Sequence, residues 1–568
     1  MWLATVARGG PAPPVTKAIT LRPLLRRAVS YSADCAIIAA MKIGDFIRQQ
    51  IVQARDRRWH GLLALVLLTI AAAVGLVHFN AASPRAWSIS EVPVAFWAWR
   101  SRLPNQADIE RAVAQTGAQT LFLRAGQIDY GDGHLRCIHT TAGRFPTAVK
   151  TYLVYNATPT LLASFEKLDT AALANQVVAS YKDDTQRATT DAAHVAGVQL
   201  DFDVPTRLLA RYAALLNALR QRLPEGTRLS ITGLPTWMAS ADLGSALAAV
   251  DFWIPQLYGA QIPSHLDEPI AIASPQAVAR DVSRAASFNR PFYAGLAAYG
   301  YAIHCAAGGE RRAVVGDLDP ALVAACRELQ LIEQRPFEPT RTGDAPASEW
   351  RYVYRATEDA QLDHLLIRAG EWLMLDVPSA AALAACGRAV RERAGEQLLG
   401  ICVFRLPESG DATALSVAEI ASALSGAHPA SSFVIEATST NKADAATVTL
   451  SLVNDGATRA RLGAGAASLI VQLPAGSLRQ LSLRGFDSSS LLCGAGDGAE
   501  IEVRNCSLRR ASAVKLELRS WSPGDRAGAV LTLASLPPAI EVRFTTSTDD
   551  GREVSERRTI PIKRERTS

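Results

Sequence analysis

Between Glu91 and about Gly426, short apolar runs alternate with stretches of helical periodicity. The apolar runs are rich in Val, Ile, Leu and aromatic residues, as expected of strands that are buried on both faces. Eight such runs occur, at 92–99, 120–128, 149–157, 195–203, 228–237, 250–259, 291–300 and 398–407. The clearest helix is predicted for Thr206 to Leu223, where Leu and Tyr recur at helical spacing before Pro224.

Eight strands with intervening helices predict an α/β fold, a (β/α)8 TIM-like barrel over 91–426. An open, doubly wound sheet is the alternative. The barrel is favoured because the strand count closes at eight and no glycine-rich phosphate loop follows the first strand. The link between the second and third strands lacks a clear helix, so we expect the barrel to be irregular there.

Two further regions have different patterns. An insertion at about 301–378 contains the segment 364–377, for which we predict a hairpin turning at Ala369–Gly370, within a small α+β lobe on the catalytic face. From Ser431, apolar and polar positions alternate between turns of Gly, Asp, Asn and Pro. This alternation predicts an all-β sandwich over 431–548.

A segment of nineteen residues, 61–79, contains no Asp, Glu, Lys or Arg. At 1.5 Å per residue a helix of this length spans about 28 Å, close to the hydrocarbon core of a bilayer. Arg55, Arg57 and Arg58 precede it, so the positive-inside rule keeps residues 1–60 in the cytoplasm. We therefore predict a single-pass signal anchor in a bacterial inner membrane, with the C-terminal part in the periplasm. A cleaved signal peptide and a buried core helix are the alternatives.

The charge of the chain is concentrated at its start. The formal net charge is +5, whereas residues 1–60 alone hold ten Lys/Arg and three Asp. The basic character therefore belongs to this N-terminal segment and does not indicate nucleic-acid binding. Residues 1–40 do not resemble a domain, and a translation start at Met41 would give an ordinary anchor sequence. An organellar transit peptide is the competing interpretation of 1–40.

Eight cysteines are present, and their spacing suggests no metal site or cofactor. Cys493 and Cys506 are close in sequence and are the best candidates for a disulfide, which a periplasmic location would permit.

The fourth strand ends in a pair of carboxylates, Asp201 and Asp203. Side chains two apart in a strand share a face, so Gln199, Asp201 and Asp203 are expected to point toward the barrel mouth. Two adjacent carboxylates repel each other, which raises the pKa of one of them, and glycosidic bond cleavage needs such an arrangement. The alternative role for Asp203 is to cap the following helix.

The segment AGVQLDFDVP (196–205) resembles the strand-four motif of family-18 chitinase-like glycoside hydrolases, DGxDxDWEYP. The resemblance places Asp203 on the catalytic Glu of that family and Asp201 on the preceding Asp. Gln256 to Gly259 lie where the family has Met-x-Tyr-Asp, so Tyr258 would steady an acetamido group. The first two Asp of the motif are replaced here. The chain also resembles an uncharacterised family of bacterial envelope proteins with an LDFD signature.

Other side chains are expected to line the mouth because they lie near the ends of predicted strands. Aromatic rings there can serve as platforms for sugars, although wall packing is an equally good interpretation. The candidates for substrate binding are Gln199, Gln256, Trp97, Trp99, Trp237, Arg124, Tyr155, Tyr299, Arg405 and Glu408. Glu408 is also the reserve acid.

Together these features predict a membrane-anchored, glycoside hydrolase-like barrel that acts on an envelope or exported polysaccharide. The reaction would be retaining hydrolysis, with Asp203 as the acid and with Asp201 and Tyr258 positioning an acetamido group. A barrel that binds glycan without cleaving it and an envelope assembly protein are the alternatives.

Overall fold

The computed structural model describes residues 92–140, 142–259, 262–268, 272–336, 350–426, 431–442, 445–495, 499–502 and 506–564. The N-terminal segment 1–60 and the predicted anchor 61–79 lie outside these ranges. Within them, no helix is both long enough and apolar enough to cross a bilayer.

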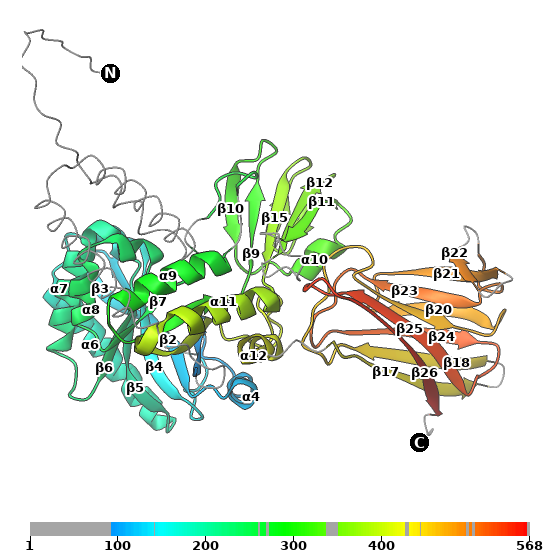
Figure 1. The fold of residues 1–568 in the computed structure, drawn as a ribbon, viewed down its shortest axis with the longest axis horizontal. Helices are drawn as coiled ribbons and strands as arrows, with labels where there is room; N and C mark the ends of the chain where they lie inside the picture. The colour runs from blue at the N-terminus through cyan, green and yellow to red at the C-terminus, as the bar shows by residue number, and fades with distance from the viewer. Residues whose placement is uncertain are drawn as a thin grey trace, which may run out of the picture. The chain divides into compact units, whose positions relative to one another are not determined.

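The core of the first half is a closed ring of eight parallel strands (Figure 1). They are β1 (Val94–Ala98), β2 (Thr120–Gly131), β4 (Lys150–Ala157), β5 (His194–Asp201), β6 (Arg228–Gly233), β7 (Phe252–Pro255), β8 (Phe292–Ala297) and β16 (Leu398–Phe404). The ring closes because β1 pairs in parallel with both β2 and β16, for example Val94 with Ile401. The predicted eight-stranded barrel is thus confirmed, and an open sheet is excluded.

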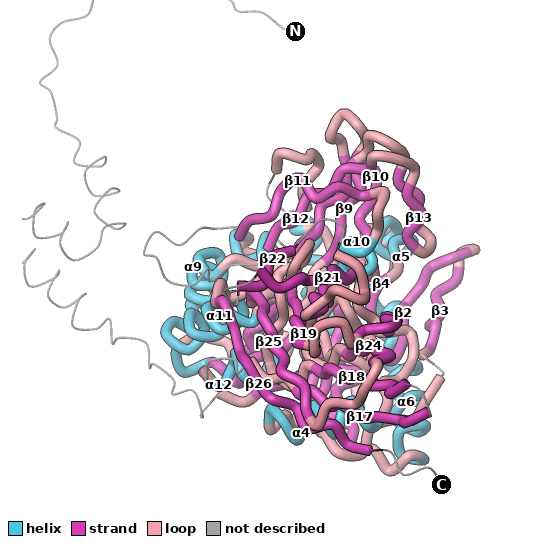
Figure 2. The backbone as a smooth tube through the Cα atoms, turned by 90° about the vertical axis from the view of Figure 1, so that its right-hand side faces the viewer, coloured by secondary structure: helices cyan, strands magenta, loops and turns pink. Residues whose placement is uncertain are grey.

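Helices surround the strands, as the sequence periodicity predicted. They are α4 (Gln106–Thr116), α5 (Pro159–Ser164), α6 (Thr170–Thr190), α7 (Leu209–Arg220), α8 (Leu243–Ala248), α9 (Pro275–Ser287), α11 (Ala380–Arg393) and α12 (Val417–Ser425). Short 3-10 turns, Thr206–Leu208, Pro235–Ala239 and Gly395–Gln397, adjoin them. The second strand is followed by β3 (His134–His139), which pairs antiparallel with β2 (Figure 2). This hairpin accounts for the missing helix after β2.

Alternate residues of β5 face opposite sides, as expected for a strand. Val198, Leu200 and Phe202 are fully buried in the layer between the barrel and its helices. Gln199 and Asp201 face the other way, into the barrel, where they bond to side chains of the neighbouring strands. The interior beneath them is filled by stacked and edge-on aromatic rings, those of Phe122, Tyr152, Phe252 and Tyr293. The barrel is therefore a packed core with polar groups at its carboxyl end.

The insertion after β8 forms a separate antiparallel sheet with one short helix. Its elements are β9 (Tyr301–Cys305), β10 (Arg311–Val315), α10 (Pro320–Ala325), β11 (Leu329–Pro336), β12 (Trp350–Ala356), β13 (Ala360–Leu362), β14 (Leu365–Ile367) and β15 (Trp372–Val377). The predicted hairpin of 364–377 is wrong. The segment β14 pairs with β13 across a turn at Asp363, and β15 pairs with β12 and β9 instead.

The C-terminal β-rich region holds ten strands in one continuous sheet that encloses its own core (Figure 1). The strands are β17 (Val434–Lys442), β18 (Ala445–Val453), β19 (Ala467–Gln472), β20 (Leu478–Arg484), β21 (Ser488–Ala495), β22 (Ala499–Glu502), β23 (Ala513–Leu518), β24 (Arg526–Leu533), β25 (Ala539–Ser547) and β26 (Glu553–Arg564). The last strand, β26, links two groups of strands within this sheet, because it pairs with β25 on one side and with β17 on the other. The strand β26 lies beyond position 548, where the sequence pattern ended the sandwich. The predicted disulfide between Cys493 and Cys506 is present.

A buried ion pair connects this sheet region to the barrel. Arg459, in the loop after β18, binds both carboxylate oxygens of Glu419 at 2.7 and 2.9 Å. Glu419 also completes a capping box with Ser416 at the start of α12. Both charged side chains are almost completely buried.

Candidate functional site

The carboxyl ends of the barrel strands bring six side chains together. Asp201 lies at the end of β5, between Asn156 of β4 and Thr232 of β6, and both neighbours hydrogen-bond to it. On the opposite side, Trp99 follows β1 and contacts Arg124 of β2 and Phe404 of β16. Active sites of such barrels occupy this face, because the loops that follow the strands meet there.

Asp201 is buried, and its environment favours the neutral carboxyl. The Thr232 hydroxyl donates to Oδ1 at 2.6 Å, and the Asn156 amide donates to Oδ2. Burial, followed by the charge of nearby Asp203, nevertheless raises the pKa of Asp201 to about 8. The Thr232 and Asn156 hydrogen bonds and the charge of Arg124 oppose this rise but do not cancel it. Near neutral pH, Asp201 therefore carries a proton.

Asp203 differs from Asp201 because its carboxyl has no partner. The strand ends at Asp201, and a hydrogen bond from the Val204 amide to the Phe202 carbonyl closes a tight turn around Asp203. The side chain is exposed, and no hydrogen bond or ion pair reaches it from the described part of the chain. Crowding by surrounding protein still removes part of its water and raises the pKa of this carboxyl. The helix-cap alternative is not realised, since the following 3-10 turn has no side-chain cap.

Tyr258 lies just past β7 and is buried against Phe404, with ring centroids 5.8 Å apart. Tyr299, after β8, packs edge-on against both rings. Burial raises the pKa of Tyr258, and Tyr299, Asp201 and Asp203 raise it further. The phenol is therefore a neutral hydroxyl within electrostatic range of the carboxylate pair.

Three predicted mouth residues lie elsewhere. The hydroxyl of Tyr155 points outward, to Asp184 of α6, and Trp237 lies in the helix layer with its indole N–H on the Val204 carbonyl. Trp97 is packed inside the barrel against Trp99 and Phe404. None of these three rings is open to a ligand, because each is almost completely buried.

Two glutamines that were predicted to bind substrate lie near Asp201. Gln199 lies one layer below Asp201, fully buried, and donates to Ser230 at 3.3 Å. Gln256 follows β7 and is partly exposed. Of the two, only Gln256 is accessible from the mouth.

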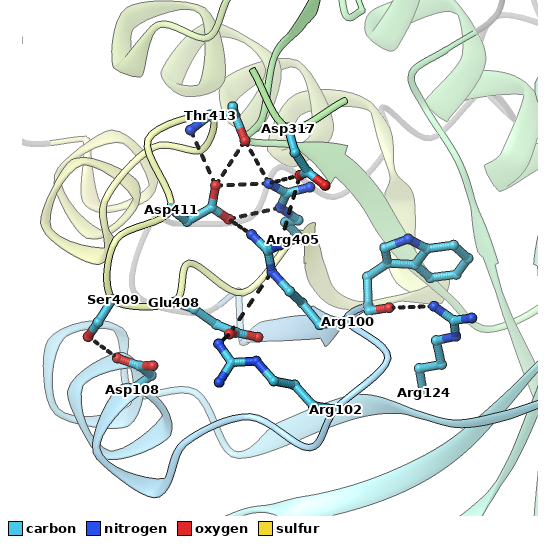
Figure 3. Close-up of polar contacts among 11 residues, drawn as sticks. Arg100, Arg102, Asp108, Arg124, Asp317, Arg405, Glu408, Ser409, Asp411 and Thr413 are labelled. Carbon is cyan, nitrogen blue, oxygen red and sulfur yellow. Dashed lines mark hydrogen bonds and ion pairs between the residues drawn. The ribbon is translucent and has the colours of Figure 1, made fainter. Parts of the chain in front are cut away.

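Arg405 and Glu408 belong to an ion-pair network beside the mouth (Figure 3). Arg405 binds Asp411 at 2.8 and 3.0 Å, and Glu408 binds Arg102 at 2.6 Å. Arg100 lies between Asp411 and Glu408, at 3.4 and 4.0 Å. Glu408 was the alternative acid in the sequence analysis. It is a poor candidate for the proton donor, because Arg102 and Arg100 favour its ionised form.

Residues 160–335 match a family described as a domain of unknown function (DUF3142). This stretch is similar to the DUF3142 family. This match confirms the resemblance to an uncharacterised family. The DUF3142 stretch includes Asp201, Asp203 and Tyr258, whereas Trp99, Arg124 and Asn156 precede it. No curated protein matches the chain.

Several solved structures are similar to this chain. A chitinase from Chromobacterium violaceum is 16% identical, with a TM-score of 0.39 and coverage of 59% of this chain and 99% of its own. The Bacillus cereus spore cortex-lytic enzyme SleL is 17% identical, with a TM-score of 0.38 and coverage of 58% and 74%. A chitinase-like agglutinin from Robinia pseudoacacia is 13% identical, with a TM-score of 0.38 and coverage of 58% and 98%. At these scores, the barrel assignment rests on the strand pairing of the chain itself.

Sequence reasoning missed three residues around Asp201 and Tyr258. Asn156 and Thr232 hold Asp201, and Phe404 supports Tyr258. Each lies at or next to the end of a barrel strand, so the rule that found Asp201 could have found them. In the described ranges, no cluster of His, Cys, Asp and Glu could hold a metal ion.

Proposed function

We propose that this barrel hydrolyses a glycan that contains N-acetylated amino sugars, within an envelope or exported polysaccharide. The observation that carries the proposal is the contrast within one pair of carboxyl groups. Asp201 is buried, bonded and neutral, while Asp203 is exposed and unpartnered with a raised pKa. An acid of raised pKa that can reach solvent is suited to general acid catalysis.

The reacting form is the one in which Asp203 is also protonated, which the raised pKa of Asp203 favours. Asp203 then gives its proton to the glycosidic oxygen as the bond from that oxygen to C1 breaks. The acetamido oxygen of the same sugar bonds to C1, and Asp201 and Tyr258 position the acetamido group. Water then attacks C1 from the vacated side, the bond from the acetamido oxygen to C1 breaks, and the water loses a proton to the Asp203 carboxylate. Two inversions at C1 give net retention.

A glycan-binding barrel without hydrolysis is the second candidate. It is favoured by one observation: Asp203 is one methylene shorter than the Glu at this place in the family-18 motif that the strand resembles. A shorter side chain can bind the sugar without reaching the glycosidic oxygen. The two candidates differ in whether product appears, because both predict binding.

The experiment is a combined binding and hydrolysis screen with the full-length protein in detergent. Oligosaccharides of N-acetylglucosamine, and their fully deacetylated counterparts, are compared by reducing-end release and by calorimetry. Hydrolysis of the acetylated series alone supports the proposal, and binding without product supports the second candidate. If no acetylated glycan is bound or cleaved, both candidates fail.

We also propose that segment 61–79 anchors the protein in the inner membrane, with the barrel in the periplasm. The Cys493–Cys506 disulfide supports an oxidising compartment, since cytosolic proteins rarely keep such bonds. A periplasm-active reporter fused after Ser568 should be active, and a cytoplasm-active reporter fused before Gly61 should be active. Recovery of the whole chain in the soluble cytosolic fraction would contradict the anchor.

A further inference from the structure

Arg124 occupies a place in the mouth that the proposed reaction does not use. It extends from β2, and its guanidinium lies 4.8 Å from the centre of the Trp99 ring. Its Nη1 donates to the Trp99 carbonyl at 3.1 Å, and Figure 3 draws the position of Arg124 beside the ion-pair network. These two contacts hold the guanidinium against the aromatic ring.

Arg124 differs from the other arginines near the mouth in its charge balance. Arg100, Arg102 and Arg405 each lie within 4.0 Å of at least one carboxylate. Across the described ranges, Arg124 has no such ion pair. The carboxyl that interacts with its charge is Asp201, which is itself kept neutral near pH 7.

One hydrogen-bonding edge of the Arg124 guanidinium also has a donor without an acceptor. Nε and Nη2 form one edge of the planar fork, the edge that binds both oxygens of a carboxylate. Nε is buried and has no acceptor in the described part of the chain. A half-buried cation without a counter-charge is costly, and burial accordingly lowers the pKa of Arg124. An anion from a ligand would remove this cost.

We infer that the mouth binds a glycan in which a carboxylate lies next to the N-acetylated amino sugar, with that carboxylate held by the free edge of Arg124 above Trp99. This inference rests on the proposed function and names its substrate class. The carboxylate can belong to a neighbouring uronic acid or to a lactyl ether on the amino sugar. Both present the same planar anion to the guanidinium.

The test uses three kinds of probe with the full-length protein in detergent. The first is a hyaluronan octasaccharide, which alternates glucuronate with N-acetylglucosamine, and the second is the same oligosaccharide after carboxyl reduction. The third is a disaccharide of N-acetylglucosamine and N-acetylmuramic acid, with its methyl ester as the uncharged control. Binding is measured by calorimetry at low and at high salt.

Arg124→Met keeps the aliphatic part of the side chain but removes the guanidinium and its charge. Arg228→Met is the matched control, because Arg228 lies at the opposite end of a barrel strand and also stacks on an aromatic ring, that of Phe252. Loss of a charged hydrogen bond is expected to weaken binding of the carboxylated probe about ten- to a hundredfold. The Arg228→Met variant should retain the wild-type preference for that probe.

Each outcome is decisive for one of the two proposals. The inference is supported if the wild type prefers one carboxylated probe over its uncharged partner, and if Arg124→Met alone loses that preference. The probe that is preferred identifies the source of the carboxylate. Equal binding of the charged and uncharged partners by the wild type overturns the inference but leaves the proposed function intact. Failure to bind any acetylated probe, charged or neutral, defeats the proposed function as well.

If the Arg124→Met variant does not fold, the salt dependence of binding to the wild type still tests the inference. If Arg124 holds a carboxylate, the preference for the charged probe should decline with salt, while binding of its uncharged partner should not. A preference that is unchanged between low and high salt would overturn the inference.

Discussion

Asp203 stands apart from the other acidic side chains near the mouth, because no donor or cation within the described ranges holds it. We expect Asp203→Asn to lower hydrolysis by about 10²- to 10⁴-fold, since the amide keeps the shape of the acid but has no proton to give. The rate is measured on any glycan that the wild type cleaves. Unchanged turnover would end the assignment of Asp203 as the acid.

The same residue offers a structural control. Because no side-chain cap is present at the following turn, Asp203→Ala should leave the melting temperature nearly unchanged while it removes hydrolysis. A helix cap would behave in the opposite way, with Asn tolerated and Ala costing about 1 kcal/mol.

Asp201 should make stability depend on pH in the direction opposite to most carboxylates. Its pKa is raised in the folded state, so the folded protein holds this proton more tightly than the unfolded chain does. Its contribution to stability is complete below about pH 4, the usual range of Asp. The contribution is lost as the pH rises toward about 8.

Urea unfolding of the wild type and of Asp201→Asn across this pH range checks the sign. The Asn variant lacks the titrating proton, so its stability relative to the wild type should increase steadily as the pH rises. Parallel stability curves for the two proteins would show that Asp201 keeps its ordinary pKa.

Within β5, Gly197 permits a close approach between two strands. A Cβ atom added there would lie 2.2 Å from the backbone carbonyl oxygen of Arg228 on β6. We expect Gly197→Ala to lower the free energy of unfolding by about 1–3 kcal/mol or more, because backbone atoms must move to admit the methyl group.

The control for Gly197 is the same substitution in an open position. A Cβ atom at Gly244, in α8, meets nothing within 4 Å, so Gly244→Ala should be neutral or stabilising by up to about 1 kcal/mol. Both values come from urea unfolding. Equal effects of the two substitutions would show that β5 and β6 are farther apart at Gly197 than described.

The elements were more predictable than the side chains that line the mouth. Runs of apolar residues located all eight barrel strands, because strands buried on both faces exclude polar residues. Because apolar residues occupy both faces of such strands, the sequence does not show which face points into the barrel. Tyr155 was therefore predicted to line the mouth, whereas the next residue, Asn156, points into it. Trp237 was misplaced for a different reason. It lies beyond the strand, in a 3-10 turn that packs back against the helices.

Pairing between distant segments was the least predictable feature. The sequence suggested that 364–377 pairs with itself, because neighbouring apolar runs usually form hairpins. The structure instead pairs β15 with β12 and β9, whose residues belong to other parts of the insertion. The Asn156 and Thr232 contacts to Asp201 arise in the same way, from strands that become neighbours only when the barrel closes.

At the scale of the whole molecule, the Arg459–Glu419 pair should couple the barrel to the C-terminal sheet region. Arg459→Met leaves Glu419 buried without its counter-charge, and removing one partner of such a pair typically costs about 3–5 kcal/mol. We expect calorimetry of this variant to show a lower melting temperature and two separated transitions in place of the coupled one.

Glu419→Gln in the same background provides the control. Gln removes the unpaired charge but can still complete the capping box with Ser416. The double variant should therefore recover much of the lost stability. A double variant as unstable as Arg459→Met would show that the lost stability comes from packing and not from an uncompensated charge.

The closure of the ring through β1 and β16 has a consequence for synthesis of the protein. Val94 emerges from the ribosome long before its partner Ile401, and at about 5–20 residues per second the interval is roughly fifteen to sixty seconds. During this time the partly formed sheet has two unpaired edges, which are prone to aggregation. The insertion between β8 and β16 lengthens the interval, so changes within it can alter the yield of protein without altering the finished barrel. We therefore expect any need for chaperones to be greatest while the chain is still being synthesised.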